Sequence, residues 1–177
     1  MALGNWFLSK KNRWAVDRLH QSIQAQALRP DFYFEGGARD NFSGRFEMTC
    51  LHGALVFRRL RNAGAAGKAL SQDVFDALFD GFDEALRDIG TGDLSVGKKI
   101  RKMGEAFYGR AKSYDAALEL LPDDSELKAL IGRTVLEGAT PAQAAVLAAY
   151  VVQAVARFAD TPVDAVIAGQ LPWPETD

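Results

Sequence analysis

The sequence predicts a single all-α domain of about six helices. Apolar residues recur three and four positions apart along most of the 177 residues, and no segment has the pattern of a central strand. Prolines, glycines and capping residues divide this pattern into helix-sized segments. A hydrophobic fraction of 48% is enough for a packed core. We expect an N-terminal helix or extension over residues 1–29 and a helical domain over residues 30–177.

The composition excludes several classes of function. The net charge of −2 disfavours nucleic-acid binding through bulk charge. A single cysteine, Cys50, rules out an internal disulfide and a cysteine-rich metal site, and it fits a reducing compartment. Any functional signal in this sequence is therefore local rather than a property of the whole composition.

The chain opens with apolar Trp6, Phe7 and Leu8, and cations follow them at positions 10, 11 and 13. A secretory leader has the opposite order, with its charges before its apolar core. Residues 1–14 are therefore expected to pack on the domain or to be disordered. The alternative is an interfacial membrane anchor, with aromatic rings in the lipid boundary and cations at the headgroups.

The first expected helix covers residues 12–27 and stops before Pro30, because the residue before a proline avoids helical geometry. Residues 30–44 are expected to form a loop. The next helix, over about residues 45–62, is apolar on two opposite faces, which predicts a central, buried position. Cys50 is then a small core residue. Its neighbour two positions on, His52, faces elsewhere on the helix, so a catalytic Cys–His pair is not expected.

A third helix is expected over residues 71–89. Its inner stripe consists of Phe75, Leu78, Phe79, Phe82, Leu86 and Ile89, and its outer side carries Asp73, Asp76, Asp80, Asp83 and Glu84. Clustered carboxylates on a helix can bind a divalent metal, as in helical prenyl synthases. The paired aspartates and the second matching helix of such sites are missing here, so a solvated acidic face is the preferred interpretation.

The most distinctive element is a long amphipathic helix over about residues 95–119. One side is apolar and carries Val96, Ile100, Met103, Phe107, Tyr114 and Leu118; the other carries Lys98, Arg101, Lys102, Glu105 and Lys112. Gly97, Gly104 and Gly109 each weaken a helix interior by roughly 0.5–1 kcal/mol relative to alanine. We expect Gly97 and Gly104, seven positions apart, to permit close approach of another backbone.

The start of this segment, GDLSVGKK at residues 92–99, nearly matches a phosphate-binding loop. Lys99 stands where that loop needs Ser or Thr for magnesium, and the preceding residues form a helix rather than a strand. A turn at Gly90 and Gly92 is the better interpretation, with Asp93 or Ser95 as the helix cap.

Two further helices are expected over about residues 125–136 and 140–158, the second opened by a capping box at Thr140 and Gln143. Residues 138–156 carry no charge, which approaches the length of a membrane span. They are rich in alanine and contain Gln143 and Gln153, so a buried helix is preferred. Trp173, between two prolines, is expected to pack loosely on the surface.

Two blocks of the sequence resemble the ubiquinol–cytochrome c chaperone family. One is DNFSGRFEMTCLHGALVFRRLR at residues 40–61. The other runs from Phe75 to Tyr114 and is centred on the string LFDGFDEALRDIGTGDLSVGKKIRKMGEAFYGRAKSYD. The resemblance covers about residues 35–135. It implies an all-α, non-enzymatic factor that assembles the cytochrome bc complex, with newly made cytochrome b as client and no cofactor. Mitochondrial members also work with a small partner protein and associate with the ribosome. This chain looks like a bacterial form, expected in the cytoplasm or peripherally at the inner membrane.

We place the partner-binding surface on the long helix and at the end of the central one. The candidate residues are Lys98, Lys99, Arg101, Lys102, Tyr108, Arg110, Lys112, Arg58, Arg59 and Arg61. Tyr108 and Arg110 are the preferred anchors, because both residue types are enriched at binding hot spots. The alternative for Arg110 is an ion pair within the chain, with Asp115 or Glu105. The alternative function is a basic module that binds RNA or the ribosome.

Overall fold

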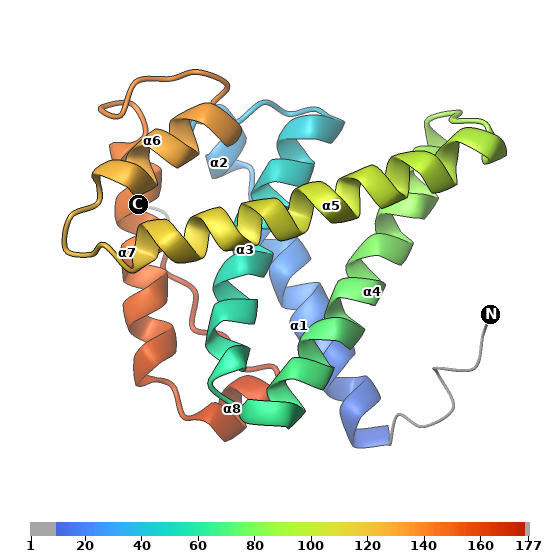
Figure 1. Ribbon diagram of the computed structural model, residues 1–177, viewed down its shortest axis with the longest axis horizontal. Helices are drawn as coiled ribbons and strands as arrows, with labels where there is room; N and C mark the ends of the chain where they lie inside the picture. Colours follow the sequence, from blue (N-terminus) through green and yellow to red (C-terminus); the bar gives the residue numbers. More distant parts are fainter. Residues whose placement is uncertain (1–9, 176–177) are drawn as a thin grey trace.

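The computed structural model describes residues 10–175, and these residues form helices and connecting loops without a strand (Figure 1). The order is α1 (Lys10–Ala27), α2 (Asp31–Phe34), α3 (Phe42–Arg61), α4 (Gly64–Asp88), α5 (Asp93–Leu118), α6 (Ser125–Thr134), α7 (Ala145–Asp160) and α8 (Val163–Ile167). The all-α prediction is confirmed. The two helices beyond the expected six are the short α2 and α8, which lie in segments expected to be loop or tail.

Helix α3 is the centre of the molecule, as its two apolar faces predict. It packs against α1, α4, α5, α7 and α8, and its buried positions include Met48, Cys50 and Leu51, all fully inaccessible. The helix begins three residues earlier than expected because Asn41 caps it, accepting a hydrogen bond from the Gly44 amide at 2.9 Å. Helix α3 therefore connects the N-terminal helix α1, the long helices α4 and α5, and the C-terminal helices α7 and α8.

Helices α4 and α5 form two arms that diverge from a tight turn and close a triangle with α3 (Figure 1). The turn has Gly90 at φ +84°, as the glycine pattern predicts. The expected cap is wrong, because Gly92 occupies the cap position and no side chain caps the helix. Asp93 instead forms an ion pair with Arg87 at the end of α4. Helix α4 also begins earlier than the expected residue 71, so its first turns border α3.

Most of the expected inner stripes are buried as predicted. On α5, Val96, Phe107, Tyr114 and Leu118 are buried, and the two remaining stripe residues are half-buried. On α4, the exception is Ile89, whose side chain is 64% exposed. Ile89 follows the last residue of α4, at the turn that leads into α5.

Helix α1 belongs to the same hydrophobic core as the rest of the chain, since Leu19 and Ile23 are fully buried against α3 and α4. Residues 1–14 were expected to pack on the domain or to be disordered. Of these, residues 1–9 precede α1 and lie outside the described residues. Trp14 is described: its ring is half exposed, and the Arg18 guanidinium lies 4.7 Å from the ring centre.

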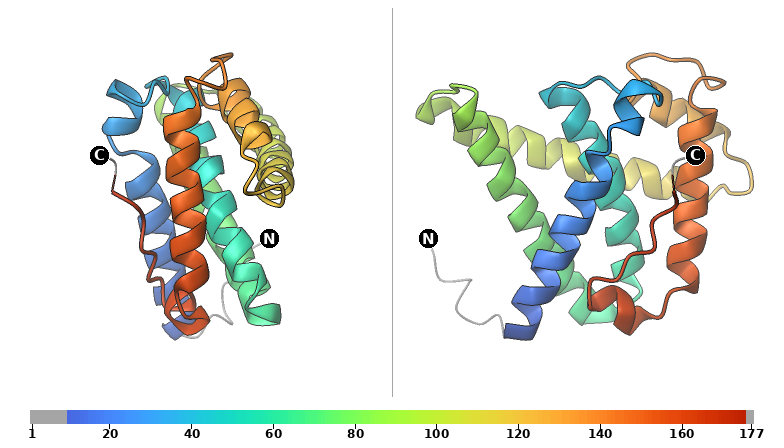
Figure 2. Two further views of the ribbon diagram at one scale, coloured as in Figure 1. Left: turned by 90° about the vertical axis from the view of Figure 1, so that its left-hand side faces the viewer. Right: turned by 180° about the vertical axis from the view of Figure 1, so that it is seen from behind.

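The C-terminal segment after α8 returns along α1 and α7 (Figure 2). The expected loose packing of Trp173 is wrong. Its indole Nε1 donates to Ser22 Oγ at 2.9 Å, and its ring lies 4.8 Å from Phe158 and 5.1 Å from His52. The tail can lie this close because Gly169 has φ +77°, and an added Cβ would lie 2.6 Å from the side chain of Arg18.

Helix α7 lies in the charge-free stretch and packs against α3 and α6. The predicted capping box forms, with Gln143 Oε1 accepting from the Thr140 amide at 2.8 Å, but the regular helix begins only at Ala145. Across residues 10–175, none of the helices is long and apolar enough to cross a membrane.

Candidate partner-binding surface

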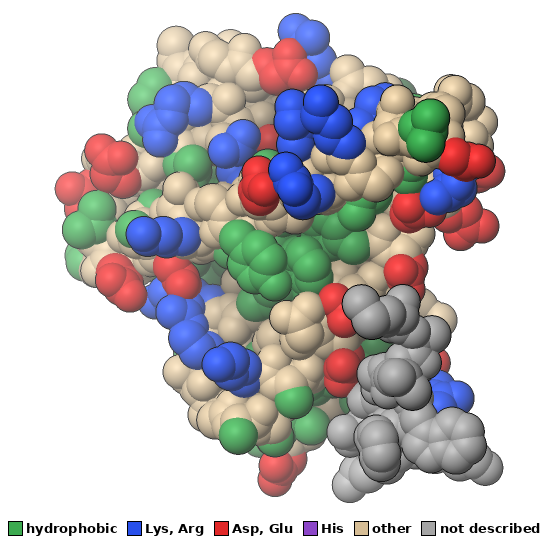
Figure 3. Space-filling view, turned by 45° about the vertical axis from the view of Figure 1, so that its right-hand side comes forward, with side chains coloured by type: hydrophobic (Ala, Val, Ile, Leu, Met, Phe, Trp, Pro, Cys, Tyr) green, Lys and Arg blue, Asp and Glu red, His purple; other side chains and the backbone are tan. Residues whose placement is uncertain are grey.

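The exposed side of α5 carries the predicted cations Lys98, Lys99, Arg101, Lys102 and Lys112, which we call the basic face. Figure 3 shows blue side chains following this helix above a gathering of hydrophobic side chains. The basic face has few internal partners. Arg101 approaches Glu105 at 3.7 Å on the surface, and Lys99 donates to Thr91 Oγ1 at 3.1 Å. Its other lysines form no ion pair within the described residues, so the basic face is open to a partner.

The four remaining candidate arginines tie helices together instead. Arg110 on α5 binds Glu47 on α3, with Nε to Oε2 at 2.8 Å and Nη2 to Oε1 at 3.0 Å. The intramolecular alternative for Arg110 is therefore the one realised, but its partner is neither of the expected carboxylates. The hydrogen bond to the Glu47 carboxylate raises the pKa of the Arg110 guanidinium above its usual value. Glu47 is only 12% exposed, so this pair helps to fix α5 on the core.

Arg58 and Arg61, at the end of α3, both bind Asp115 of α5. Arg58 Nη1 lies 2.7 Å from Asp115 Oδ1, and Arg61 Nη2 binds the other carboxylate oxygen. Arg59 donates to the carbonyl oxygens of Phe158 and Thr161, each at 2.6 Å, at the end of α7. Of these arginines, Arg61 keeps 57% of its side chain exposed and can still reach a partner.

Tyr108 lies beside the basic face, with 53% of the residue exposed. Its ring stacks on Phe75 of α4 with centroids 4.9 Å apart, and Phe75 stacks on Phe79 at 4.3 Å. Burial raises the pKa of the Tyr108 phenol, and the nearby Asp76 carboxylate raises it further. Tyr108 is therefore held in position by a stack of aromatic rings while much of its surface remains accessible.

Next to Tyr108, the triangle of α3, α4 and α5 encloses a groove of about 460 Å³, which we call the α3–α5 groove. Its lining residues are Ala54, Phe57, Arg58, Arg61, Gly64, Lys68, Ser71, Gln72, Tyr108, Ala111 and Asp115. Small and aromatic side chains form much of this lining, and charged side chains add to it from all three helices. This combination of an apolar interior with charged groups is typical of a binding groove.

Sequence reasoning missed two parts of this groove. Lys68 lies before the expected start of the third helix, so its place on a helix was not apparent. Phe75 was assigned to the inner stripe, but it is only half-buried and supports Tyr108 at the surface. The helix-forming Ala-rich segment at 64–70 is the signal that would have extended α4 toward α3.

The three glycines of α5 have different surroundings. An added Cβ at Gly104 would lie 3.7 Å from the Phe75 ring, whereas Gly97 and Gly109 would have nothing within 4 Å. No backbone of the described chain therefore approaches the helix at Gly97 or Gly109. These two positions stay open for contact with another molecule.

The family profile described as ubiquinol-cytochrome C chaperone matches residues 35–173. The chain belongs to the ubiquinol–cytochrome c chaperone family. The match extends beyond the residues 35–135 that carry the sequence resemblance and adds α7, α8 and most of the tail. The family is one of assembly factors rather than enzymes.

Known relatives agree with this assignment. The ubiquinol-cytochrome-c reductase complex assembly factor 1 of Xenopus laevis is 23% identical over 172 residues, covering 93% of this chain and 84% of that protein. The Mus musculus assembly factor 1 is also 23% identical, but the match covers 71% of this chain and only 43% of the mouse protein. The crystal structure of the Cbp3 homolog from Brucella abortus superimposes with a TM-score of 0.84 at 32% identity, covering 94% of this chain and 92% of that one.

His52 and Cys50, the two side chains considered as a catalytic pair, have structural roles in this chaperone family member. His52 is fully buried: its Nδ1 donates to the Met48 carbonyl at 2.8 Å, so its Nε2 accepts from the Tyr150 hydroxyl at 2.9 Å. Burial lowers the pKa of His52 to about 4, so the ring is neutral at neutral pH. Cys50 is buried as expected, and burial raises the pKa of its thiol well above the usual value.

The acidic side of α4 also has a structural explanation. Asp83 accepts from Arg87 Nε at 2.6 Å, and Asp76 accepts from Gln72 at 2.8 Å. Within residues 10–175, no three His, Cys, Asp or Glu side chains gather where they could hold a metal ion. Residues 92–99, which nearly match a phosphate-binding loop, do not form a loop. Helix α5 begins at Asp93, directly after the first glycine of the motif.

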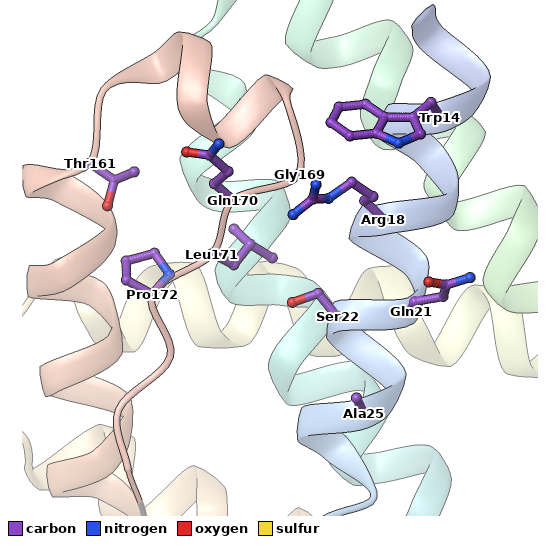
Figure 4. A pocket seen from close by; sticks show the side chains of 10 residues that line it. All are labelled: Trp14, Arg18, Gln21, Ser22, Ala25, Thr161, Gly169, Gln170, Leu171 and Pro172. Atoms are coloured by element: carbon purple, nitrogen blue, oxygen red, sulfur yellow. The ribbon is translucent and has the colours of Figure 1, made fainter. Parts of the chain in front are cut away.

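The chaperone domain has a larger but shallower depression on its opposite side, between α1 and the returning C-terminal segment (Figure 4). It measures about 870 Å³ and has Trp14, Arg18 and Gln21 on one wall and Gln170 and Leu171 on the other. Its lining is more polar, with a single charged side chain, Arg18. We therefore regard the α3–α5 groove and the adjoining basic face as the candidate binding surface.

Proposed function

We propose that this chain is a chaperone in the assembly of the ubiquinol–cytochrome c reductase complex, with newly made cytochrome b as its client. The observation that carries the proposal is the family match over residues 35–173. The printed names of the frog and mouse relatives agree in naming assembly factors of this complex. In this function the chain binds and releases a protein, so no catalytic group is required.

The candidate surface has the properties that such a client demands. A membrane protein presents apolar helices flanked by polar loops, and a helper must cover the former without sticking to unrelated proteins. The α3–α5 groove supplies apolar and aromatic contact area around Tyr108, and the basic face supplies charges that orient the client. Tyrosine at the centre of such a surface is a frequent source of binding energy.

Reversing the basic face tests this function. We expect the triple variant Lys98→Glu, Arg101→Glu, Lys102→Glu to fold normally, because these side chains are exposed and at most weakly paired. Cytochrome b accumulation in cells should fall. The matched control reverses three exposed cations outside α5, namely Arg13 and Arg18 on α1 and Arg39 in the loop before α3. Normal cytochrome b accumulation with the folded triple variant would show that the basic face is not the client surface.

The open lysines of the basic face also favour a second candidate, binding to RNA or to the ribosome. Phosphate contacts release counterions, so affinity would fall steeply with salt, whereas binding through an apolar groove is much less salt-sensitive. A salt titration with purified ribosomes and with a cytochrome b segment distinguishes the two. Co-purification after crosslinking in cells would identify a small partner protein as well.

We place the chain in the cytoplasm, peripherally at the inner membrane where the client is inserted. The sequence pattern of residues 1–14 supports an interfacial contact, with Trp14 the described aromatic at its end. Liposome flotation of the full chain and of a variant lacking residues 1–13 measures it. Equal flotation of the two would assign any membrane contact to another surface.

A further inference from the structure

We propose that the α3–α5 groove binds an apolar helical segment that ends in acidic side chains, and that this segment belongs to the client. The inference rests on the proposed function and specifies the chemistry of the client segment. It is carried by the charges at the rim of the groove, the small residues of its lining and the position of Tyr108.

The rim of the groove has an excess of positive charge. Arg58, Arg61 and Lys68 line it, and Asp115 is the single carboxylate among its lining residues. Asp115 is already saturated, because each of its oxygens binds one of the two arginines. Lys68 is exposed and forms no ion pair within the described residues. Two positive charges therefore lack a counter-charge, and an acidic group on a partner would supply it.

The interior of the groove suits a helix. Ala54 and Ala111 present small side chains between α3 and α5, and Gly64 has no side chain at the adjoining start of α4. An added Cβ at Gly64 would meet no atom of residues 10–175 within 4 Å, so these residues leave the space beside it open. An amphipathic helix commonly docks its apolar side into a groove of this kind between helices.

The two ends of the groove differ in charge, which fixes the direction of the bound segment. Lys68 and Arg61 lie at the end formed by α3 and the start of α4. At Tyr108, the nearby carboxylate is Asp76, which raises the pKa of the phenol. A segment with carboxylates at its C-terminal end, where the helix dipole is also negative, matches this polarity when that end lies at Lys68.

The test uses two synthetic 16-residue alanine–leucine helix peptides, one ending in two aspartates and one in two lysines. Binding to the full chain is measured by fluorescence anisotropy. We expect the aspartate peptide to bind about tenfold more tightly, since one pairing is attractive and the other repulsive. The variant Lys68→Glu should reverse or abolish the preference. It should fold normally, because Lys68 is exposed and forms no ion pair within residues 10–175.

The matched control is Arg133→Glu on α6, which also reverses an exposed cation without an ion pair in the described residues but lies outside both the groove lining and the basic face. Equal binding of the two peptides, or an equal loss of preference in both variants, would overturn the inference. So would sedimentation showing a dimer of the chain that Lys68→Glu dissociates, because a second copy would then be the occupant.

Failure of the inference and failure of the proposed function give different results. If the peptides are not discriminated but reversal of the basic face lowers cytochrome b accumulation, the groove inference is wrong and the proposed function stands. If the peptides are discriminated but neither the basic-face variant nor Lys68→Glu changes cytochrome b accumulation, the groove chemistry stands and the client is wrong.

Discussion

Arg110 of α5 and Glu47 of α3 form a two-pronged ion pair, with both nitrogen–oxygen distances at or below 3.0 Å. A guanidinium and a carboxylate in this geometry are strongly oriented as well as attracted. The pair connects the central helix to the helix that carries the basic face. Its position explains how a long surface helix is held at a fixed angle across the core.

The variant Arg110→Ala should therefore be destabilised by about 2–3 kcal/mol, because Glu47 would remain largely buried without its partner. Chemical denaturation measures the loss. The exposed Lys112→Ala on the same helix should change the free energy of unfolding by less than about 0.5 kcal/mol. If Arg110→Ala kept full stability but lost client binding, Arg110 would be a contact residue rather than a structural one.

The returning tail gives a second prediction, centred on Trp173. Trp173→Ala should cost about 2–3 kcal/mol, because the ring packs on Phe158 and His52. Trp173→Phe keeps much of that packing and loses the hydrogen bond to Ser22, so about 1 kcal/mol is expected. Thermal unfolding of the two variants checks the order. Equal stability of wild type and Trp173→Ala would mean that the tail does not contribute to the fold.

The sequence predicted the buried and exposed faces of α5 well, because successive residues of an α-helix are rotated about 100° around its axis. The buried positions of Phe107 and Tyr114 and the exposure of Lys98 all follow from that periodicity. The ends of elements were predicted less well. The Asn41 cap and the early start of α4 depend on local hydrogen bonds and packing that the apolar pattern does not record.

The tertiary partners of the arginines could not be predicted at all. Glu47 lies 63 positions from Arg110, and the carbonyl that Arg59 binds on Phe158 lies 99 positions away. Helical spacing identifies neighbours on one helix, so only carboxylates near Arg110 in sequence were considered. The α3–α5 groove could not be predicted for the same reason, because residues of three separate helices line it.

Acid should destabilise the protein through His52. Burial lowers its pKa from 6.5 to about 4, so below pH 6.5 the unfolded chain binds a proton that the folded chain does not. Stability is therefore complete above pH 6.5 and falls as the pH drops toward 4, by about 3 kcal/mol in total. His20 adds to the loss in the same direction, since burial also lowers its pKa.

Urea denaturation between pH 7 and pH 4 measures this dependence. The control variant His52→Gln cannot take up the proton, so its stability should fall less steeply over the same range. It should be less stable than the wild type at pH 7, because His52 bonds both Met48 and Tyr150. Identical slopes for the two proteins would assign the acid sensitivity to other groups.

The open glycines of α5 separate folding from binding. Gly97→Ala and Gly109→Ala should each stabilise the helix by about 0.5–1 kcal/mol, because no atom of the described part of the chain lies within 4 Å of the added methyl group. Gly67→Ala on α4 is the contrasting case. Its Cβ would lie 1.9 Å from the Leu60 carbonyl oxygen, so this variant should be strongly destabilised.

A partner that approaches the helix closely beside Tyr108 would reverse the benefit at Gly109. We expect Gly109→Ala to raise the melting temperature by about 1–4 °C and yet to weaken binding of a cytochrome b segment. Gly97 lies about three helical turns before Tyr108 on α5. Gly97→Ala should therefore raise the melting temperature by a similar amount and leave binding unchanged. If Gly109→Ala is more stable and binds as well as the wild type, close contact occurs elsewhere, and the glycine has no role in holding the client.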